Sequence, residues 1–187
     1  MRILTITKTL IVPLLILGFS NLSFGFQSTA QLSGLINHPV GGIWVSNNDT
    51  NSPSDPEGYK SFWMTFKNGI NEASVFGEIH GIKNNGDSTM LMEIWNFISP
   101  SDSSIRLVQN TIWGEYSIGN IQLYKGKHMD IAFKSVTANG QVYYTRDIHY
   151  LISKNEMRAE TFQKMKEEEK WKKAGESIWK RIYQKLE

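Results

Sequence analysis

Cysteine is absent from the 187 residues of this chain. Without cysteine the protein cannot form disulfide bonds, so a folded domain has to be stabilised by its packed core. The absence also excludes a lipid-anchored lipoprotein, because that anchor is attached to a cysteine that follows the apolar leader.

Apolar runs of membrane-spanning length are missing as well. The longest covers residues 10–19, which is ten residues, whereas a spanning helix needs about 20. Arg2 and Lys8 precede this run, and Ser23 and Gly25 follow it as small residues at positions −3 and −1 of a cleavage after Gly25. A basic start, a short apolar core and a small-residue site are typical of a secretory signal.

We therefore expect residues 1–25 to be a signal peptide and residues 26–187 to be a single mature domain. The protein would then be exported, either to the periplasm or out of the cell, with no membrane span after cleavage. An uncleaved N-terminal anchor and a buried helix are the alternatives for the same apolar run.

An excess of charge of one sign is also lacking. The chain has 20 Lys+Arg against 18 Asp+Glu, and two of the basic residues lie in the expected signal, which leaves 18 of each. A neutral domain lacks the electrostatic footprint of nucleic-acid binding. We therefore expect no nucleic-acid partner.

Motifs for metal binding and catalysis are missing too. Ser54 and Lys60 stand where a calcium loop needs glycine and glutamate. Residues 115–119 miss the first glycine of Gly-x-Ser-x-Gly, and no phosphate-cradling glycine loop occurs. No two of the histidines are spaced like zinc ligands. These are His38, His80, His128 and His149. We expect no metal and assign no catalytic residue.

The chain does contain many strand-length segments in which apolar and polar residues alternate. Residues 62–67 and 128–134 alternate in this way, and residues 142–152 are rich in Tyr, Ile and Val. Asn-Gly at residues 85–86 and 139–140 is a strong hairpin signal. With no helical stretch between these segments, the pattern predicts an all-β protein, an antiparallel barrel or sandwich of about eight to ten strands.

Two segments could be helical. Ser28 could cap a short N-terminal helix that runs to Leu35. Residues 159–187 contain good helix formers and no proline, but residues 157–162 and 178–183 alternate as strands do. We expect two final strands there, joined around residues 167–169.

A short helix followed by Gly42-Ile43-Trp44 on the first strand resembles the calycin superfamily, which includes lipocalins and fatty-acid-binding proteins. Roughly residues 30–183 resemble a lipocalin-like barrel. The resemblance implies an up-and-down antiparallel barrel that binds a small hydrophobic or amphipathic molecule. It also implies that Lys180 or Arg181 packs across Trp44, as a late basic residue often does in lipocalins.

The resemblance to fatty-acid-binding proteins gives the pair Arg181 and Tyr183 a role, since such a pair holds a carboxylate inside those barrels. A contact of Arg181 with Trp44 is the structural alternative. Some related barrels hold haem through one histidine, and His149 or His80 would be the candidate here. Otherwise we expect no cofactor.

The expected strand over residues 143–150 has the most side chains that could bind a ligand or transfer a proton. An inward Arg146 flanked by Tyr144 would suit an anionic ligand. An inward Asp147 and His149 would instead polarise a ligand or transfer a proton. The alternative is that the inward face supplies Tyr and Ile to the core and the charged groups are solvated.

Three further residues complete the candidate ligand-binding site. Trp63 and Trp95, with Tyr144, would provide interior aromatic walls. Glu93 lies in an apolar strand, so it belongs at a barrel mouth or inside with a partner such as Arg146, because an unpaired buried charge is costly. A filled barrel serving as a structural or interaction module, and a small barrel enzyme using Asp147 and His149, remain the alternative functions.

Overall fold

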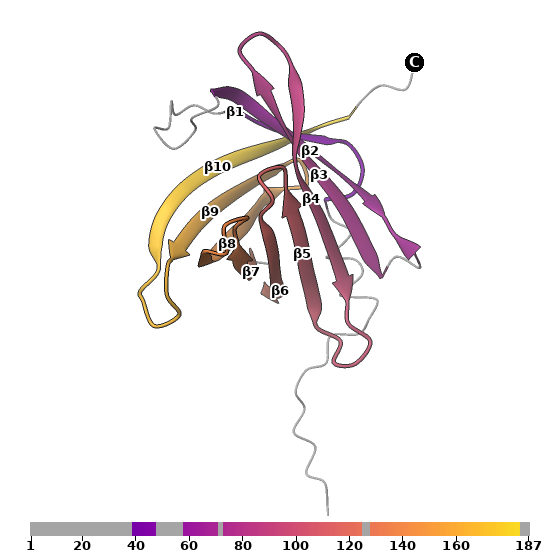
Figure 1. Ribbon diagram of the computed structural model, residues 1–187. Coiled ribbons are helices and arrows are strands. Elements are labelled where there is room, and N and C mark those ends of the chain that lie inside the picture. Colours follow the sequence, from indigo (N-terminus) through magenta and orange to yellow (C-terminus); the bar gives the residue numbers. More distant parts are fainter. Residues whose placement is uncertain (1–38, 48–57, 71–72, 125–127, 184–187) are drawn as a thin grey trace, which may run out of the picture.

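The computed structural model describes residues 39–47, 58–70, 73–124 and 128–183, and these form a closed barrel of antiparallel strands (Figure 1). The strands are β1 Ile43–Asn47, β2 Tyr59–Asn68, β3 Ser74–Lys83, β4 Ser88–Ile98, β5 Ile105–Thr111, β6 Tyr116–Tyr124, β7 His128–Val136, β8 Val142–Ser153, β9 Glu156–Lys164 and β10 Lys172–Ile182. Each strand pairs with its neighbours in the chain, and β1 pairs with β10. The predicted all-β antiparallel barrel is therefore confirmed.

The described residues contain no α-helix. Nor do they include any helix with the length and hydrophobicity needed to cross a membrane. The expected helix over residues 28–35 and the expected signal over residues 1–25 lie outside the described residues.

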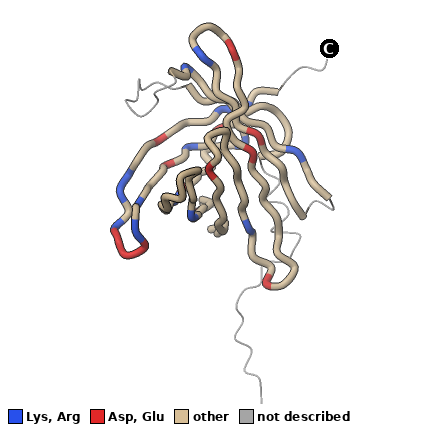
Figure 2. Tube along the Cα trace, in the orientation of Figure 1, with Lys and Arg blue, Asp and Glu red and all other residues tan. Residues whose placement is uncertain are grey.

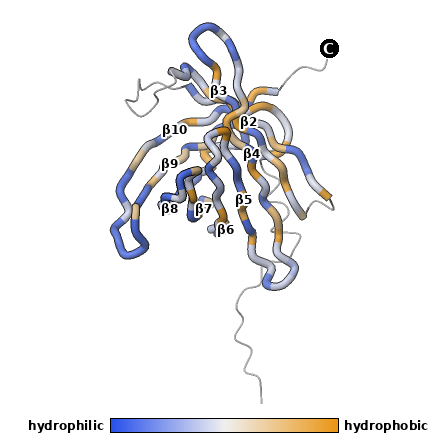
Figure 3. The backbone as a smooth tube through the Cα atoms, in the orientation of Figure 1, coloured by the Kyte–Doolittle hydropathy of each residue, from blue (hydrophilic) through white to orange (hydrophobic). Residues whose placement is uncertain are grey.

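The C-terminal segment is β-structure, as its alternation predicted. Strands β9 and β10 pair through eight register positions, from Lys172 opposite Gln163 to Lys180 opposite Glu156. The many good helix formers do not prevent this, because tertiary pairing overrides intrinsic helix propensity. Polar residues, coloured blue, cover the hairpin that joins these strands (Figure 3).

The inner face of the barrel is mainly apolar and forms two buried clusters. One cluster comprises Val75, Ile105, Leu107, Ile121 and Ile131. The other comprises Trp44, Met64 and Met157. Basic and acidic residues are interspersed along the described strands (Figure 2). Apolar side chains are not confined to the interior, since Phe76, Trp95 and Ile118 are exposed on the outer face.

The first and last strands meet at a buried tryptophan. Trp44 is 0% exposed, and its indole Nε1 donates a hydrogen bond of 3.0 Å to the backbone oxygen of Pro39. Arg181 lies opposite Trp44 in the register, and its guanidinium carbon lies 4.3 Å from the centre of the indole ring. The expected packing of a late basic residue across Trp44 is confirmed for Arg181.

Two inward glycines lie where a neighbouring strand approaches closely. The Phe66 ring covers Gly77 across one strand pair, and Gly119 pairs closely with Phe133 across another. A Cβ at Gly77 would fall within the Phe66 ring, whereas a Cβ at Gly119 would clash with the backbone of Ala132 and Phe133. Glycines of this kind allow the sharp bending that closes a barrel.

Candidate functional site

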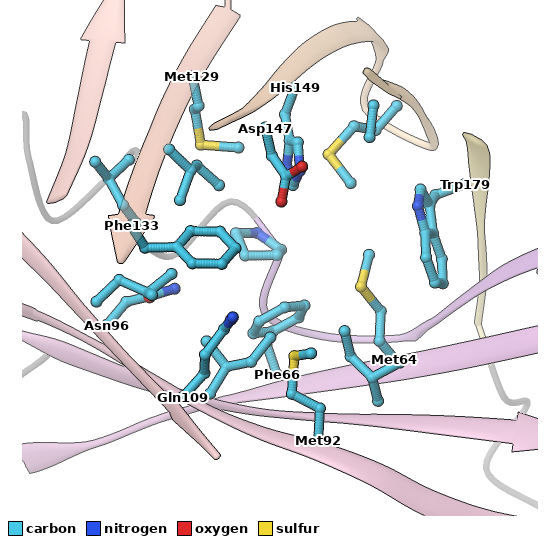
Figure 4. Close-up of a pocket in the computed structure, with 18 of the residues that line it drawn as sticks. Met64, Phe66, Met92, Asn96, Gln109, Met129, Phe133, Asp147, His149 and Trp179 are labelled. Atoms are coloured by element: carbon cyan, nitrogen blue, oxygen red, sulfur yellow. The ribbon is translucent and has the colours of Figure 1, made fainter. Parts of the chain in front are cut away.

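A cavity of about 230 Å³ lies inside the barrel (Figure 4). Its walls come from nine of the ten strands and are mostly Ile, Leu, Met and aromatic side chains. The methionines and aromatic residues among them are Met64, Phe66, Met92, Met129, Phe133, Met157 and Trp179. Methionine is flexible and polarisable, so these walls can adapt to an apolar guest of irregular shape.

Six polar side chains interrupt the apolar walls, in two groups. Asn96 on β4 and Gln109 on β5 form one group. The other consists of Asp147, His149, Thr161 and Ser177 on β8 to β10. In the circular strand order β4 and β5 stand across the barrel from β8 to β10, and Figure 4 shows Asn96 and Gln109 across the cavity from Asp147 and His149.

Asp147 and His149 project inward from β8, because residues two apart on a strand share a face. Burial raises the pKa of Asp147 to about 6, and a hydrogen bond from Thr161 opposes part of the rise. Burial lowers the pKa of His149 to about 4. Near neutral pH, the cavity therefore holds a carboxylate and an uncharged imidazole.

These two shifts predict opposite effects of pH on stability. The raised pKa of Asp147 removes stability as pH rises from about 4 to about 6, whereas the lowered pKa of His149 removes stability as pH falls from about 6.5 to about 4. Each effect is worth up to about 3 kcal/mol. In the wild-type protein they largely cancel.

Single variants should expose each effect. Relative to wild type, Asp147→Asn should gain stability as pH rises from about 4 to about 6, and His149→Gln should lose it over the same range. Urea unfolding at stepped pH measures both differences. If the free energy of unfolding of both variants changes with pH as that of the wild type does, the assignment of these effects to Asp147 and His149 is wrong.

A search of protein-family models and a search of curated protein sequences found no match to this chain. The function proposed below is therefore inferred from the cavity and its lining residues.

Of the eight residues that the sequence placed in a ligand site, His149 lines the cavity. The two expected tryptophan walls lie on the outer face instead. Trp63 stacks on His80 with ring centres 3.8 Å apart. Trp95 is 42% exposed, stacks with Phe76 and packs at a tilt against Phe97. Both tryptophans alternate with inward residues, so neither can face the cavity.

Tyr144 and Arg146 also lie on the outer face, since Asp147 and His149 take the inward positions of β8. The Arg146 guanidinium binds both carboxylate oxygens of the buried Asp130 on β7, which raises the pKa of Arg146. Glu93 is exposed and lies opposite Glu78. Arg146 is therefore not its partner.

Arg181 and Tyr183 stand at the end of the barrel where β1 and β10 meet. Arg181 packs on Trp44, and one of its terminal nitrogens donates to the Tyr183 hydroxyl at 3.4 Å. That hydroxyl donates in turn to the Asn155 side chain at 3.2 Å. Through these contacts Arg181 and Tyr183 connect Trp44 with Asn155 at this end of the barrel. Neither Arg181 nor Tyr183 lines the cavity described above.

Sequence reasoning missed Asn96 and Gln109, the polar residues on the opposite wall. Each occupies an inward position that follows an apolar inward residue on its strand, Ile94 before Asn96 and Leu107 before Gln109. A polar residue at an inward position of an apolar strand is the signal that could have found them. The described residues contain no group of three or more His, Asp or Glu side chains that could hold a metal ion.

Proposed function

We propose that this barrel binds one small, largely hydrophobic molecule in its interior cavity. The supporting observation is the cavity itself, which is about 230 Å³, mostly apolar and interrupted by a few polar side chains on two walls. Small-molecule sites in proteins generally have this composition. A barrel packed solid would have no such space, so the cavity favours ligand binding over a filled structural module.

The proposal extends to family and location. The closed barrel and the contact of Arg181 with Trp44 support membership of the calycin superfamily. The N-terminal pattern supports export of residues 26–187. Function still depends on the site and not on the fold.

Filling the cavity should abolish binding. Ala159 is a buried residue on the cavity wall, so Ala159→Phe would place a ring where the ligand lies. We expect the wild-type protein to bind the neutral fluorescent dye N-phenyl-1-naphthylamine saturably. We expect the variant to bind it at least about tenfold more weakly, which is about 1.4 kcal/mol.

The matched control is Ala132→Phe, which puts the same ring on the exposed outer face of β7. It should bind the dye as the wild type does. Native mass spectrometry of the protein from its own host gives a second measurement, because a retained molecule would appear as added mass. A folded Ala159→Phe protein with unchanged dye affinity would overturn the proposal.

A small barrel enzyme is the second candidate, because Asp147 and His149 line the same cavity. A carboxylate with a pKa near 6 suits a general base near neutral pH. A molecule recovered from the host protein and left unchanged after long incubation with fresh protein would exclude this candidate.

A haem held in the cavity would need a histidine that faces it. His80 lies on the outer face against Trp63, so only His149 of the two candidate ligands faces the cavity. We propose that the protein holds no cofactor. A Soret band in purified protein, lost in His149→Gln, would show otherwise.

A further inference from the structure

We propose that the cavity selects a ligand with hydrogen-bond donors on both sides of an apolar body, such as an amino alcohol, over a carboxylic acid of the same length. This inference rests on the proposed function and names its ligand class. It follows from two buried oxygen atoms, one on each wall, that have no hydrogen-bond partner among the described residues.

The first unsatisfied atom belongs to Asp147. Its Oδ1 is buried and has no hydrogen-bond partner among the described residues. A carboxylate oxygen accepts hydrogen bonds and donates none when ionised. A buried acceptor left unpaired destabilises a protein, so a ligand that supplies a donor at this position gains affinity.

The second unsatisfied atom lies on the opposite wall. Asn96 is 8% exposed and lines the cavity. Its Oδ1 is likewise buried without a hydrogen-bond partner among the described residues. Because β4 and β8 are four strands apart in the barrel, one molecule would need a donor at each side to satisfy both oxygens.

Between the two oxygens the walls are apolar. Figure 4 shows Phe66 on β2 and Phe133 on β7 between the wall that carries Asn96 and the wall that carries Asp147. An apolar segment joining the two donors would therefore match the surface that it meets.

A carboxylate ligand finds no positive charge here. The described lining residues include neither lysine nor arginine. Arg146 is held by Asp130 on the outer face, and Arg181 packs on Trp44 at the barrel end. The one histidine, His149, stays uncharged near neutral pH because burial lowers its pKa. A buried anion beside Asp147 would be both unpaired and repelled.

A matched series of eight-carbon probes tests the selection. Octanoic acid, 1-octanol, octylamine and 8-amino-1-octanol are each used to displace N-phenyl-1-naphthylamine from the protein at pH 7.5. We expect 8-amino-1-octanol to bind tightest and octanoic acid to bind at least about tenfold more weakly than octylamine, because hydrogen bonds to a charged group are the stronger ones.

Two variants assign the preference to the two oxygens. Asp147→Asn removes the charge and should reduce the advantage of octylamine over octanoic acid. Asn96→Leu removes the second acceptor and should reduce the advantage of 8-amino-1-octanol over octylamine. Glu93→Gln removes a carboxylate from the outer face and should change neither ratio. Circular dichroism establishes that each variant is folded.

The outcomes separate the two proposals. Octanoic acid that binds as tightly as octylamine, in protein that binds the dye, would overturn the donor preference and leave ligand binding intact. An Asp147→Asn protein with unchanged ratios would do the same. Failure of the dye and of all four probes to bind would overturn the proposed function itself.

Discussion

Trp44→Ala should lower the free energy of unfolding by about 3 to 5 kcal/mol, the usual cost of truncating a fully buried aromatic residue. Trp44 is 0% exposed and packs with Met64 and Met157. The variant also loses the contact with the Arg181 guanidinium and the hydrogen bond to Pro39. Urea unfolding followed by circular dichroism measures the change.

Trp95→Ala is the matched control. Trp95 also lies on a strand, but it is 42% exposed and stacks only on outer-face rings. Its loss should cost about 1 kcal/mol, the scale of an aromatic pair. Equal losses in the two variants would show that the end of the barrel around Trp44 contributes no special stability.

Gly119→Ala should destabilise the barrel by about 3 kcal/mol or more, although it adds a single methyl group. A Cβ at this position would stand 2.2 Å from the backbone oxygen of Ala132 and 2.7 Å from the Cα of Phe133. Backbone atoms cannot rotate away as a side chain can, so strands β6 and β7 would have to separate. The loss should appear in the midpoint of urea unfolding.

Gly175→Ala makes the same substitution where there is room. A Cβ at Gly175 meets nothing within 4 Å, and the position lies at a register shift between β9 and β10. We expect a change within about 0.5 kcal/mol, as for ordinary surface positions. A Gly119→Ala protein as stable as Gly175→Ala would mean that β6 and β7 are not packed as closely as the structure has them.

The sequence was sufficient to predict the barrel. Alternation over residues 62–67 and 128–134 and the Asn-Gly turns located strands and hairpins, because a half-buried strand imposes a period of two on hydrophobicity. The same period located β9 and β10 despite their helix-forming composition. Alternation alone left a sandwich open; the resemblance at Gly42-Ile43-Trp44 implied the barrel and the packing of Lys180 or Arg181 on Trp44.

The candidate site was harder to predict, because alternation separates two faces without saying which one is inward. Trp63, Trp95 and Tyr144 suggested interior walls by their size, yet each lies on an outer face. There the two tryptophans stack on neighbouring rings, and the Lys164 ammonium lies over the Tyr144 ring. Facing side chains become apparent only once strands distant in the chain are placed together. Asn96 and Asp147 belong to the same site for that reason alone.

The pairing of β1 with β10 sets an order of events during synthesis. Ile43 lies opposite Ile182, so nearly the whole described chain intervenes between two residues that must meet. Contacts at such separation form late, because closing a long loop costs entropy before any contact repays it. A nascent chain cannot complete this ring until its last strand has left the ribosome.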